Sequence, residues 1–173
     1  NMMRGKFGLV GRVKEGDLDL MNEFLTVLEK GKLDYTNAFL SLEQMLISEK
    51  ETERGEGSNE NKVRILCEEY DEVSLEMKNG NTPLASTVQK WKDRVSETLS
   101  DSILSMKKNN PRVIARNHLV ESALSLASNQ KDLNEFNDLL DVLRFPYSND
   151  PVSAKHQGPP KGGDASYQTF CGT

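Results

Sequence analysis

The stretch TPLASTVQKWKDRVSETL, residues 82–99, decides the fold class of this chain. A threonine such as Thr82 accepts hydrogen bonds from the free amides at a helix start, and Pro83 at the first helical position loses no needed hydrogen bond. Apolar residues then recur after four, three, four and four positions, at Leu84, Val88, Trp91, Val95 and Leu99. This spacing predicts that the longest helix of the chain begins here, with Trp91 in a buried seam.

Upstream of this stretch, the sequence predicts two helices joined as a hairpin. Asp17 is the candidate cap of the first helix and Gly31 its stop, and its apolar side consists of Met21, Phe24, Leu25 and Leu28. Asp34 or Thr36 is the candidate cap of the second, whose apolar side consists of Phe39, Leu42, Met45 and Leu46. Residues 1–16 are rich in glycine but lack GxxxxGK followed by Ser or Thr. They are expected to be a turn-rich entry segment.

Two further segments lie between this hairpin and residue 82. Residues 48–61 contain no apolar side chain and predict an exposed, mobile loop. Residues 62–78 predict a third helix with Ile65, Leu66, Tyr70, Val73 and Met77 on its buried side.

Downstream, Asn110-Pro111 predicts a break, because the residue before a proline is pushed out of the helical region and the proline itself suits a helix start. The next helix is expected to bury Ile114, Leu119, Val120, Ala123, Leu124 and Ala127. Asp132 is the candidate cap of a last helix that buries Phe136, Leu139, Leu140 and Leu143 and ends at Phe145-Pro146. We therefore expect an all-α, irregular bundle of about six helices over 1–147 and an extended tail over 148–173.

The composition argues against several classes of function. The formal net charge is −5 with acids and bases interspersed, which gives no basic surface for a nucleic acid. No apolar run approaches the ~20 residues that a membrane span needs. The cysteines Cys67 and Cys171 are far apart, there is no CxxC, and only His118 and His156 could complete a zinc set, so no zinc spacing exists.

Few residues are candidates for chemistry. His118 is expected to be a partly exposed helical histidine, and His156 lies in the predicted tail. Arg116 and Asn117 form a fork of hydrogen-bond donors that suits a structural tie between neighbouring loops. Cys171, third from the end, is either a spare exposed cysteine or a redox one. The sequence predicts no catalytic, cofactor-binding or metal-binding residue.

Several motifs resemble those of the selenoprotein O family. The three most specific are NPRVIARNHL (110–119), LLDVLRFPY (139–147) and the terminal TFCGT (169–173). Further matches are MRGKFGL (3–9), DYTNAF (34–39), and the tryptophan and arginine of WKDRV (91–95). The resemblance gives Trp91, Asn110, Pro111, Arg116 and Asn117 a structural role.

Members of that family have a kinase-like fold and transfer AMP from ATP to Ser, Thr or Tyr hydroxyls of proteins. The resemblance implies that this chain is the C-terminal part of such an enzyme, packed against a kinase-like core that binds ATP and Mg. The start at Asn1 then reflects a truncation, although a tag remnant is the other interpretation. The location is expected to be cytoplasmic, or mitochondrial in a eukaryotic source.

In the family, the residue third from the end is selenocysteine or cysteine and pairs with a cysteine near the active site. Cys171 matches this position, which favours a redox role with a partner outside this chain. No Cys67–Cys171 disulfide is expected. Two other hypotheses remain open: a free-standing helical module that binds a partner protein, and a small metal or nucleotide enzyme built on Arg116 and His118.

Overall fold

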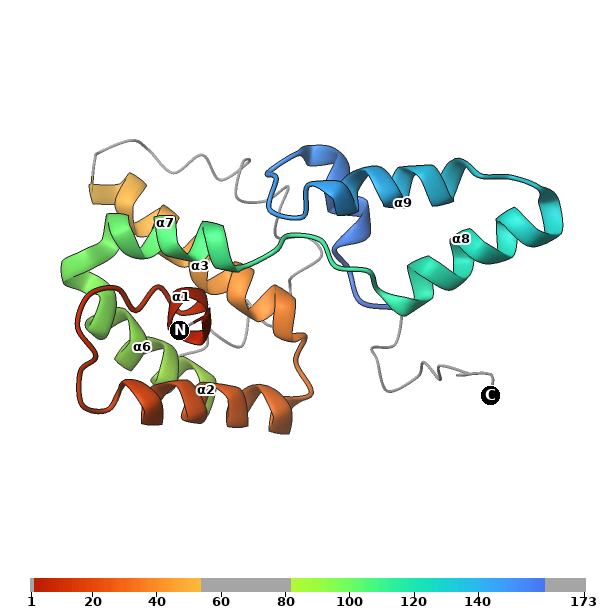
Figure 1. The fold of residues 1–173 in the computed structure, drawn as a ribbon. Coiled ribbons are helices and arrows are strands. Elements are labelled where there is room, and N and C mark those ends of the chain that lie inside the picture. Colours follow the sequence, from red (N-terminus) through yellow and green to blue (C-terminus); the bar gives the residue numbers. More distant parts are fainter. Residues whose placement is uncertain (1, 54–81, 161–173) are drawn as a thin grey trace. The chain divides into compact units, whose positions relative to one another are not determined.

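The computed structural model describes residues 2–53 and 82–160, and every regular element in these ranges is a helix (Figure 1). The prediction of an all-α fold is confirmed. The chain forms two compact units, residues 1–110 and 111–173. No helix among the described residues has the length and apolar character needed to cross a membrane.

Unit 1 contains α1 (Met2–Lys6), α2 (Asp17–Gly31), α3 (Tyr35–Glu53), α6 (Pro83–Val95), the 3₁₀ turn η1 (Ser96–Thr98) and α7 (Leu99–Asn109). Helix α2 packs on α6, and α7 packs on both α1 and α3. In Figure 1, α1 lies at the centre of this unit, with α2 and α6 below it and α3 and α7 above. Helix α1 therefore lies between these two pairs of helices, although none of its residues is fully buried.

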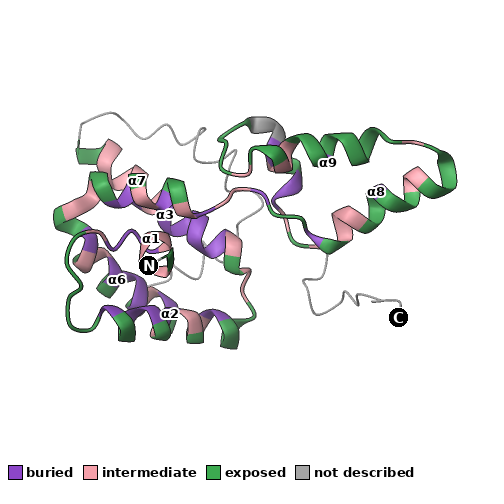
Figure 2. Ribbon diagram, in the orientation of Figure 1, coloured by how far each residue is buried: buried purple, intermediate pink, exposed green. Residues whose placement is uncertain are grey.

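The core of unit 1 is built around Phe7, which has no exposed surface. Its ring centroid lies 5.2 Å from that of Phe24 on α2 and 4.9 Å from that of Phe39 on α3, in edge-to-face geometry. Trp91 on α6 is also fully buried, as the sequence predicts. Figure 2 shows buried segments, in purple, on α3 and α6. Residues 1–16 are thus more than a turn-rich entry, because they supply both a helix and the centre of the core.

The long helix predicted from Pro83 is interrupted. It ends at Val95, η1 follows, and α7 begins at Leu99. The hydroxyl of Ser96 donates to the Asp93 carbonyl (2.9 Å), and that of Thr98 donates to the Val95 carbonyl (3.3 Å). Hydroxyl side chains of this kind compete with backbone hydrogen bonds and often bend a helix. The seam is therefore divided between two helices with different neighbours.

The ends of α2 and α3 differ in part from expectation. Gly16, in the left-handed region at φ 87°, is the N-cap of α2, so the prediction that Asp17 is the cap is wrong. Asp34 does cap α3, because its carboxylate accepts from the Asn37 amide (2.7 Å). Helix α3 continues to Glu53, and the first six residues of the predicted loop 48–61 are helical. The Ser-Glu-Lys-Glu-Thr-Glu run holds no glycine or proline that would stop a helix. Residues 54–61 of the predicted loop lie outside the described residues, as do Cys67 and the helix predicted over 62–78.

Unit 2 contains the hairpin of α8 (Asn117–Gln130) and α9 (Asn134–Arg144), followed by the 3₁₀ turn η2 (Pro151–His156). Pro111 does not begin a helix, because the amides of Arg112 and Val113 both donate to the carbonyl of Pro146 (2.6 and 3.3 Å). These bonds fix the start of the irregular segment 111–116, which leads into α8. The tail predicted to be extended from 148 instead forms η2 over 151–156.

The burial predicted for α8 and α9 is confirmed in part. Ala123 and Leu139, at the contact between the two helices, are buried. Ile114, Leu124, Phe136 and Leu140 were expected in the core but are exposed. Ile114 lies outside α8, and two helices provide one shared contact, which leaves the rest of each apolar side uncovered.

Candidate functional site

Two of the predicted motif residues hold the first residues of the chain inside unit 1. The indole Nε1 of Trp91 donates to the carbonyl of Phe7 (2.7 Å), in a fully buried setting. The amide of Asn110 donates to the carbonyl of Lys6 (2.9 Å), and its Oδ1 accepts from the Lys6 amine (3.5 Å). Two consecutive carbonyls at the end of α1 are thus bound by side chains from 84 and 104 positions further along. Trp91 and Asn110 thus bind the backbone at the end of α1, and the structural-motif role expected for them stays a prediction.

Lys6 belongs to the same cluster. Its amine lies over the rings of Tyr35 and Phe39, 5.7 and 5.5 Å from their centroids, in a cation–π arrangement. Burial lowers the pKa of Lys6 and raises the pKa of Tyr35. Both groups are harder to ionise than in water.

A buried ion cluster around Asp17 fixes the loop between α1 and α2. The Asp17 side chain is 2% exposed. Arg94 on α6 approaches it with two nitrogens, Nε to Oδ1 at 2.6 Å and Nη2 to Oδ2 at 3.1 Å, and Arg4 lies at 3.4 Å from Oδ2. Arg4 also donates to the carbonyls of Gly11 and Arg12, both at 3.3 Å. One carboxylate and two guanidinium groups therefore tie α1, the loop and α6 together.

Asp17 stays ionised in this cluster. Burial alone would raise the pKa of its carboxyl, but the hydrogen bonds from Arg94 and the Lys14 amide, together with the charges of Arg94 and Arg4, lower the pKa below its usual value. The arrangement is structural, because the guanidinium groups of Arg4 and Arg94 bind Asp17 and also donate to backbone carbonyls.

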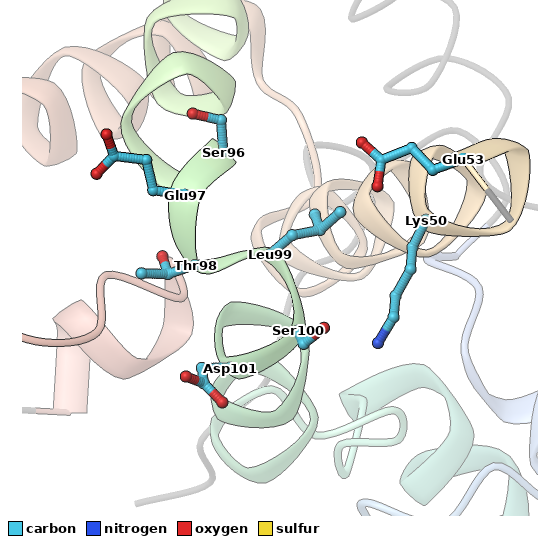
Figure 3. A pocket seen from close by; sticks show the side chains of 8 residues that line it. All are labelled: Lys50, Glu53, Ser96, Glu97, Thr98, Leu99, Ser100 and Asp101. Atoms are coloured by element: carbon cyan, nitrogen blue, oxygen red, sulfur yellow. The ribbon is translucent and has the colours of Figure 1, made fainter.

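A hollow at the junction of α3, η1 and α7 is shown in Figure 3. Lys50 and Glu53 line it from the end of α3, and η1 with the first turn of α7 supplies Ser96, Glu97, Thr98, Leu99, Ser100 and Asp101. The volume is about 440 Å³. Small-molecule pockets of this size are mostly apolar with a few polar groups, whereas only Leu99 is apolar here. The hollow has the character of a solvated surface.

A second hollow lies in unit 2, between the hairpin and η2. It is lined by Leu119, Ser122, Glu135, Asp138, Leu139, Lys155 and His156. The Ser122 hydroxyl donates to Glu135 (2.8 Å), and the Lys155 amine donates to Asp138 (2.7 Å). The hydrogen bond from Lys155, its charge and the charge of His156 lower the pKa of Asp138. His156, expected in a loose tail, is buried.

The other predicted motif residues lie in unit 2. The Arg116 carbonyl accepts from the amides of Leu119 and Val120, both at 3.0 Å, so Arg116 is the N-cap of α8 through its backbone. The Arg116 side chain is buried, whereas Asn117 is exposed and Pro111 is half-buried. His118 is half-buried, as predicted. Cys171 lies outside the described residues.

The sequence did not single out the Asp17 cluster. Asp17 and Arg94 are 77 positions apart. The sequence indicated Asp17 only as a helix cap and Arg94 only as part of a family motif. The one available signal is the position of Arg94 three residues after Trp91, which places it beside the buried side of α6. Among residues 2–53 and 82–160, no three His, Cys, Asp or Glu side chains are grouped to hold a metal ion.

Comparison with known proteins gives a consistent result. A family model described as "Protein adenylyltransferase SelO" matches residues 1–144. A protein of Pelagibacter ubique (strain HTCC1062), named "Protein nucleotidyltransferase YdiU", is 36% identical over 176 residues. Proteins of the same name from Rhizobium meliloti (strain 1021) and Bacillus cytotoxicus are 33% and 32% identical over 174 residues.

The three alignments cover 100%, 99% and 99% of this chain but only 31%, 31% and 30% of the respective relatives. The chain thus spans just under a third of the length of these curated relatives. No solved structure matches it.

Proposed function

Because the chain belongs to the SelO family of protein adenylyltransferases, we propose that it is the helical C-terminal part of such an enzyme and carries none of its catalytic residues. The observation that carries this proposal is the family match over residues 1–144, in a chain that covers about 31% of its relatives. The remaining two thirds of the polypeptide would be the kinase-like core.

In the proposed enzyme, the core binds ATP and Mg and transfers AMP to a Ser, Thr or Tyr hydroxyl of a protein substrate. Nucleotidyl transfer depends on cations placed around the phosphates. The buried or half-buried cations of unit 1 described above have structural partners: Arg4 and Arg94 bind Asp17, and Lys6 packs on aromatic rings. We therefore assign no step of the transfer to this chain.

The contribution of this chain is proposed to be a rigid helical support. Its first residues are clamped by Trp91, Asn110 and the Asp17 cluster, so that unit 1 is a closed bundle. A support of this kind restricts the motion of a catalytic domain to which it is joined. We propose the cytoplasm as its location, in line with its bacterial relatives.

We propose a redox role for Cys171, on its match to the family position third from the end. The partner thiol would belong to the kinase-like core. Mass spectrometry of the oxidised, unreduced full polypeptide should show Cys171 joined to a cysteine outside residues 1–173. A Cys67–Cys171 bond in that spectrum would contradict the proposal.

The proposed function is tested by reading the genomic frame on both sides of this sequence and assaying the complete product. With ATP labelled in its α-phosphate, the complete polypeptide should label protein hydroxyls, and this chain alone should not. If the frame encodes no further protein, the chain is a free-standing helical interaction module, which is the alternative. Labelling by this chain alone would overturn the non-catalytic role.

A further inference from the structure

The amine of Lys6, the last residue of α1, is held by two aromatic rings and one amide oxygen. The ring centroids of Tyr35 and Phe39 on α3 lie 5.7 and 5.5 Å from this amine. Asn110 Oδ1 lies 3.5 Å from it. In the part of the chain that the structure describes, no carboxylate pairs with this amine. The ammonium form of Lys6 therefore has no anionic partner there.

This setting stabilises the ammonium form of Lys6 less than water does. The three N–H donors of an ammonium group meet one acceptor among the described residues, at the outer limit of hydrogen-bond distance. Lys90 shows the stronger arrangement, with its amine 2.7 Å from a carboxylate oxygen of Glu23. Lys6 is half-buried, and burial lowers its pKa. At neutral pH, a larger share of this amine is therefore in the neutral, nucleophilic form than is usual for a lysine.

We propose that the Lys6 amine is a site of acylation by a small acyl phosphate, and that acylation loosens the end of α1. The amine is half-buried, so a donor with little bulk around its acyl carbon reaches it more easily than a thioester on a large carrier. An acyl phosphate is such a donor. Acylation of Lys6 is independent of the proposed function, because it needs only residues of unit 1.

The chemical step needs only the amine and the acyl phosphate. The neutral nitrogen attacks the carbonyl carbon, and a C–N bond forms. The bond from that carbon to the phosphate oxygen breaks, and phosphate leaves with the electron pair. Overall, the ammonium group and the acyl phosphate give an amide, hydrogen phosphate and one proton released to water. The acylated side chain is uncharged.

Loss of this charge acts on a part of unit 1 that depends on few contacts. Helix α1 has five residues, none of them buried, so packing and hydrogen bonds from elsewhere must hold it. Acylation ends the cation–π attraction between the amine and both rings. It also places an acyl group beside Asn110, whose amide binds the Lys6 carbonyl at 2.9 Å. The backbone amides that follow α1 should therefore open to solvent more often.

The first test compares the acetylation rates of two lysines in the 173-residue chain. Acetyl phosphate is added in limiting amount, and peptide mass spectrometry measures the acetylated fraction at each lysine. At about pH 7.5, Lys6 should react about threefold or more faster than Lys107, an exposed lysine on α7. Access alone would favour Lys107, which makes it the matched control. In urea the two lysines should react at similar rates, because the difference depends on the fold.

The pH dependence and the donor are tested in the same way. In the folded chain, the rate at Lys6 should level off at a lower pH than the rate at Lys107, since burial lowers the pKa of Lys6. With acetyl-coenzyme A in place of acetyl phosphate, the ratio of Lys6 to Lys107 acetylation should fall. An equal or higher ratio with this bulky thioester would reject a small acyl phosphate as the donor.

The effect on α1 is measured by hydrogen exchange of the Leu9 amide, which donates to the Arg4 carbonyl at 2.9 Å. Exchange should be about threefold or more faster in the chain acetylated at Lys6 and in Lys6→Gln, whose side chain is also uncharged. Lys6→Arg keeps the charge and should exchange like the unchanged chain. Lys107→Gln is the control for loss of a lysine charge elsewhere and should also leave the exchange unchanged.

Acetylation of Lys6 that is no faster than that of Lys107 at any pH would overturn the proposal, because it would show that the rings and Asn110 shield the amine. Unchanged exchange at Leu9 in both the acetylated chain and Lys6→Gln would show that the modification leaves α1 in place, and would reject its effect on the fold. If Lys6→Gln does not fold, the exchange of the acetylated chain decides alone.

Discussion

Replacement of Arg94 by methionine tests whether the Asp17 cluster stabilises unit 1. Methionine keeps most of the side-chain length and removes the charge and both hydrogen bonds to the carboxylate. Asp17 is almost fully buried, and the Arg94 side chain is 13% exposed. The variant would therefore leave a carboxylate inside the protein with its best partner missing.

The expected loss of unfolding free energy is about 2 kcal/mol. Breaking a fully buried ion pair from one side costs about 3–5 kcal/mol. The cost is lower here because two partners stay with Asp17: Arg4 at 3.4 Å and the Lys14 amide at 3.1 Å. A double variant, Arg94→Met with Asp17→Asn, should lose less than the sum of the single losses, because no buried carboxylate is left without its best partner.

Urea unfolding followed by circular dichroism would measure the loss. The matched control is Lys90→Met on the same helix, whose partner Glu23 also lies on α2, at 2.7 Å. That pair is 57% and 40% exposed, so its loss should cost below about 1 kcal/mol. Should the two variants prove equally destabilised, burial would not be what gives the Asp17 cluster its strength.

Three further outcomes are expected from unit 1. The folded-state pKa of Asp17 is lowered, so the stability that this group contributes is present above the unfolded pKa of ~3.9 and is lost as the pH falls through the folded pKa. Between about pH 6 and 3, the urea midpoint should therefore fall less steeply for Asp17→Asn than for the unchanged protein. Gly8→Ala should lower the unfolding free energy by above about 2 kcal/mol, since φ is +65° and the new Cβ would lie 3.0 Å from the Ser102 carbonyl oxygen. Gly11→Ala, at φ +74° but in open space, should lower it by only about 1 kcal/mol. Comparison of the two thermal unfolding midpoints tests this difference. Asn110→Ala should cost about 1–3 kcal/mol in urea unfolding, because a part-buried carbonyl at the end of α1 loses its donor at 2.9 Å, and an unchanged midpoint would show that water replaces it.

Local signals predicted much of the helical content. The periodic apolar positions and Gly31 located α2, Asp34 located the start of α3, and Phe145-Pro146 located the end of α9. These signals act within one or two turns of chain, which is why they can be read from neighbouring residues.

Features that depend on distant residues were not predicted. Pro111 suits a helix start, but the amides after it are bound by the Pro146 carbonyl, 35 positions away. The break at Ser96 separates two halves of the seam that pack on different helices, α6 on α2 and α7 on α1 and α3, and this division could not be read from neighbouring residues. The role of residues 3–9 could not be read locally either, because Phe7 is central only once α2, α3 and α6 surround it.

The position of Phe7 also sets the order in which unit 1 can assemble during synthesis. Phe7 leaves the ribosome before α2 and α3, whereas the indole of Trp91 and the amide of Asn110, which hold the end of α1, follow 84 and 104 positions after the carbonyls that they bind. The bundle therefore cannot close until nearly all of unit 1 has been translated, and its early helices wait with their apolar sides exposed. Nascent α2 and α3 are consequently the segments most in need of a chaperone.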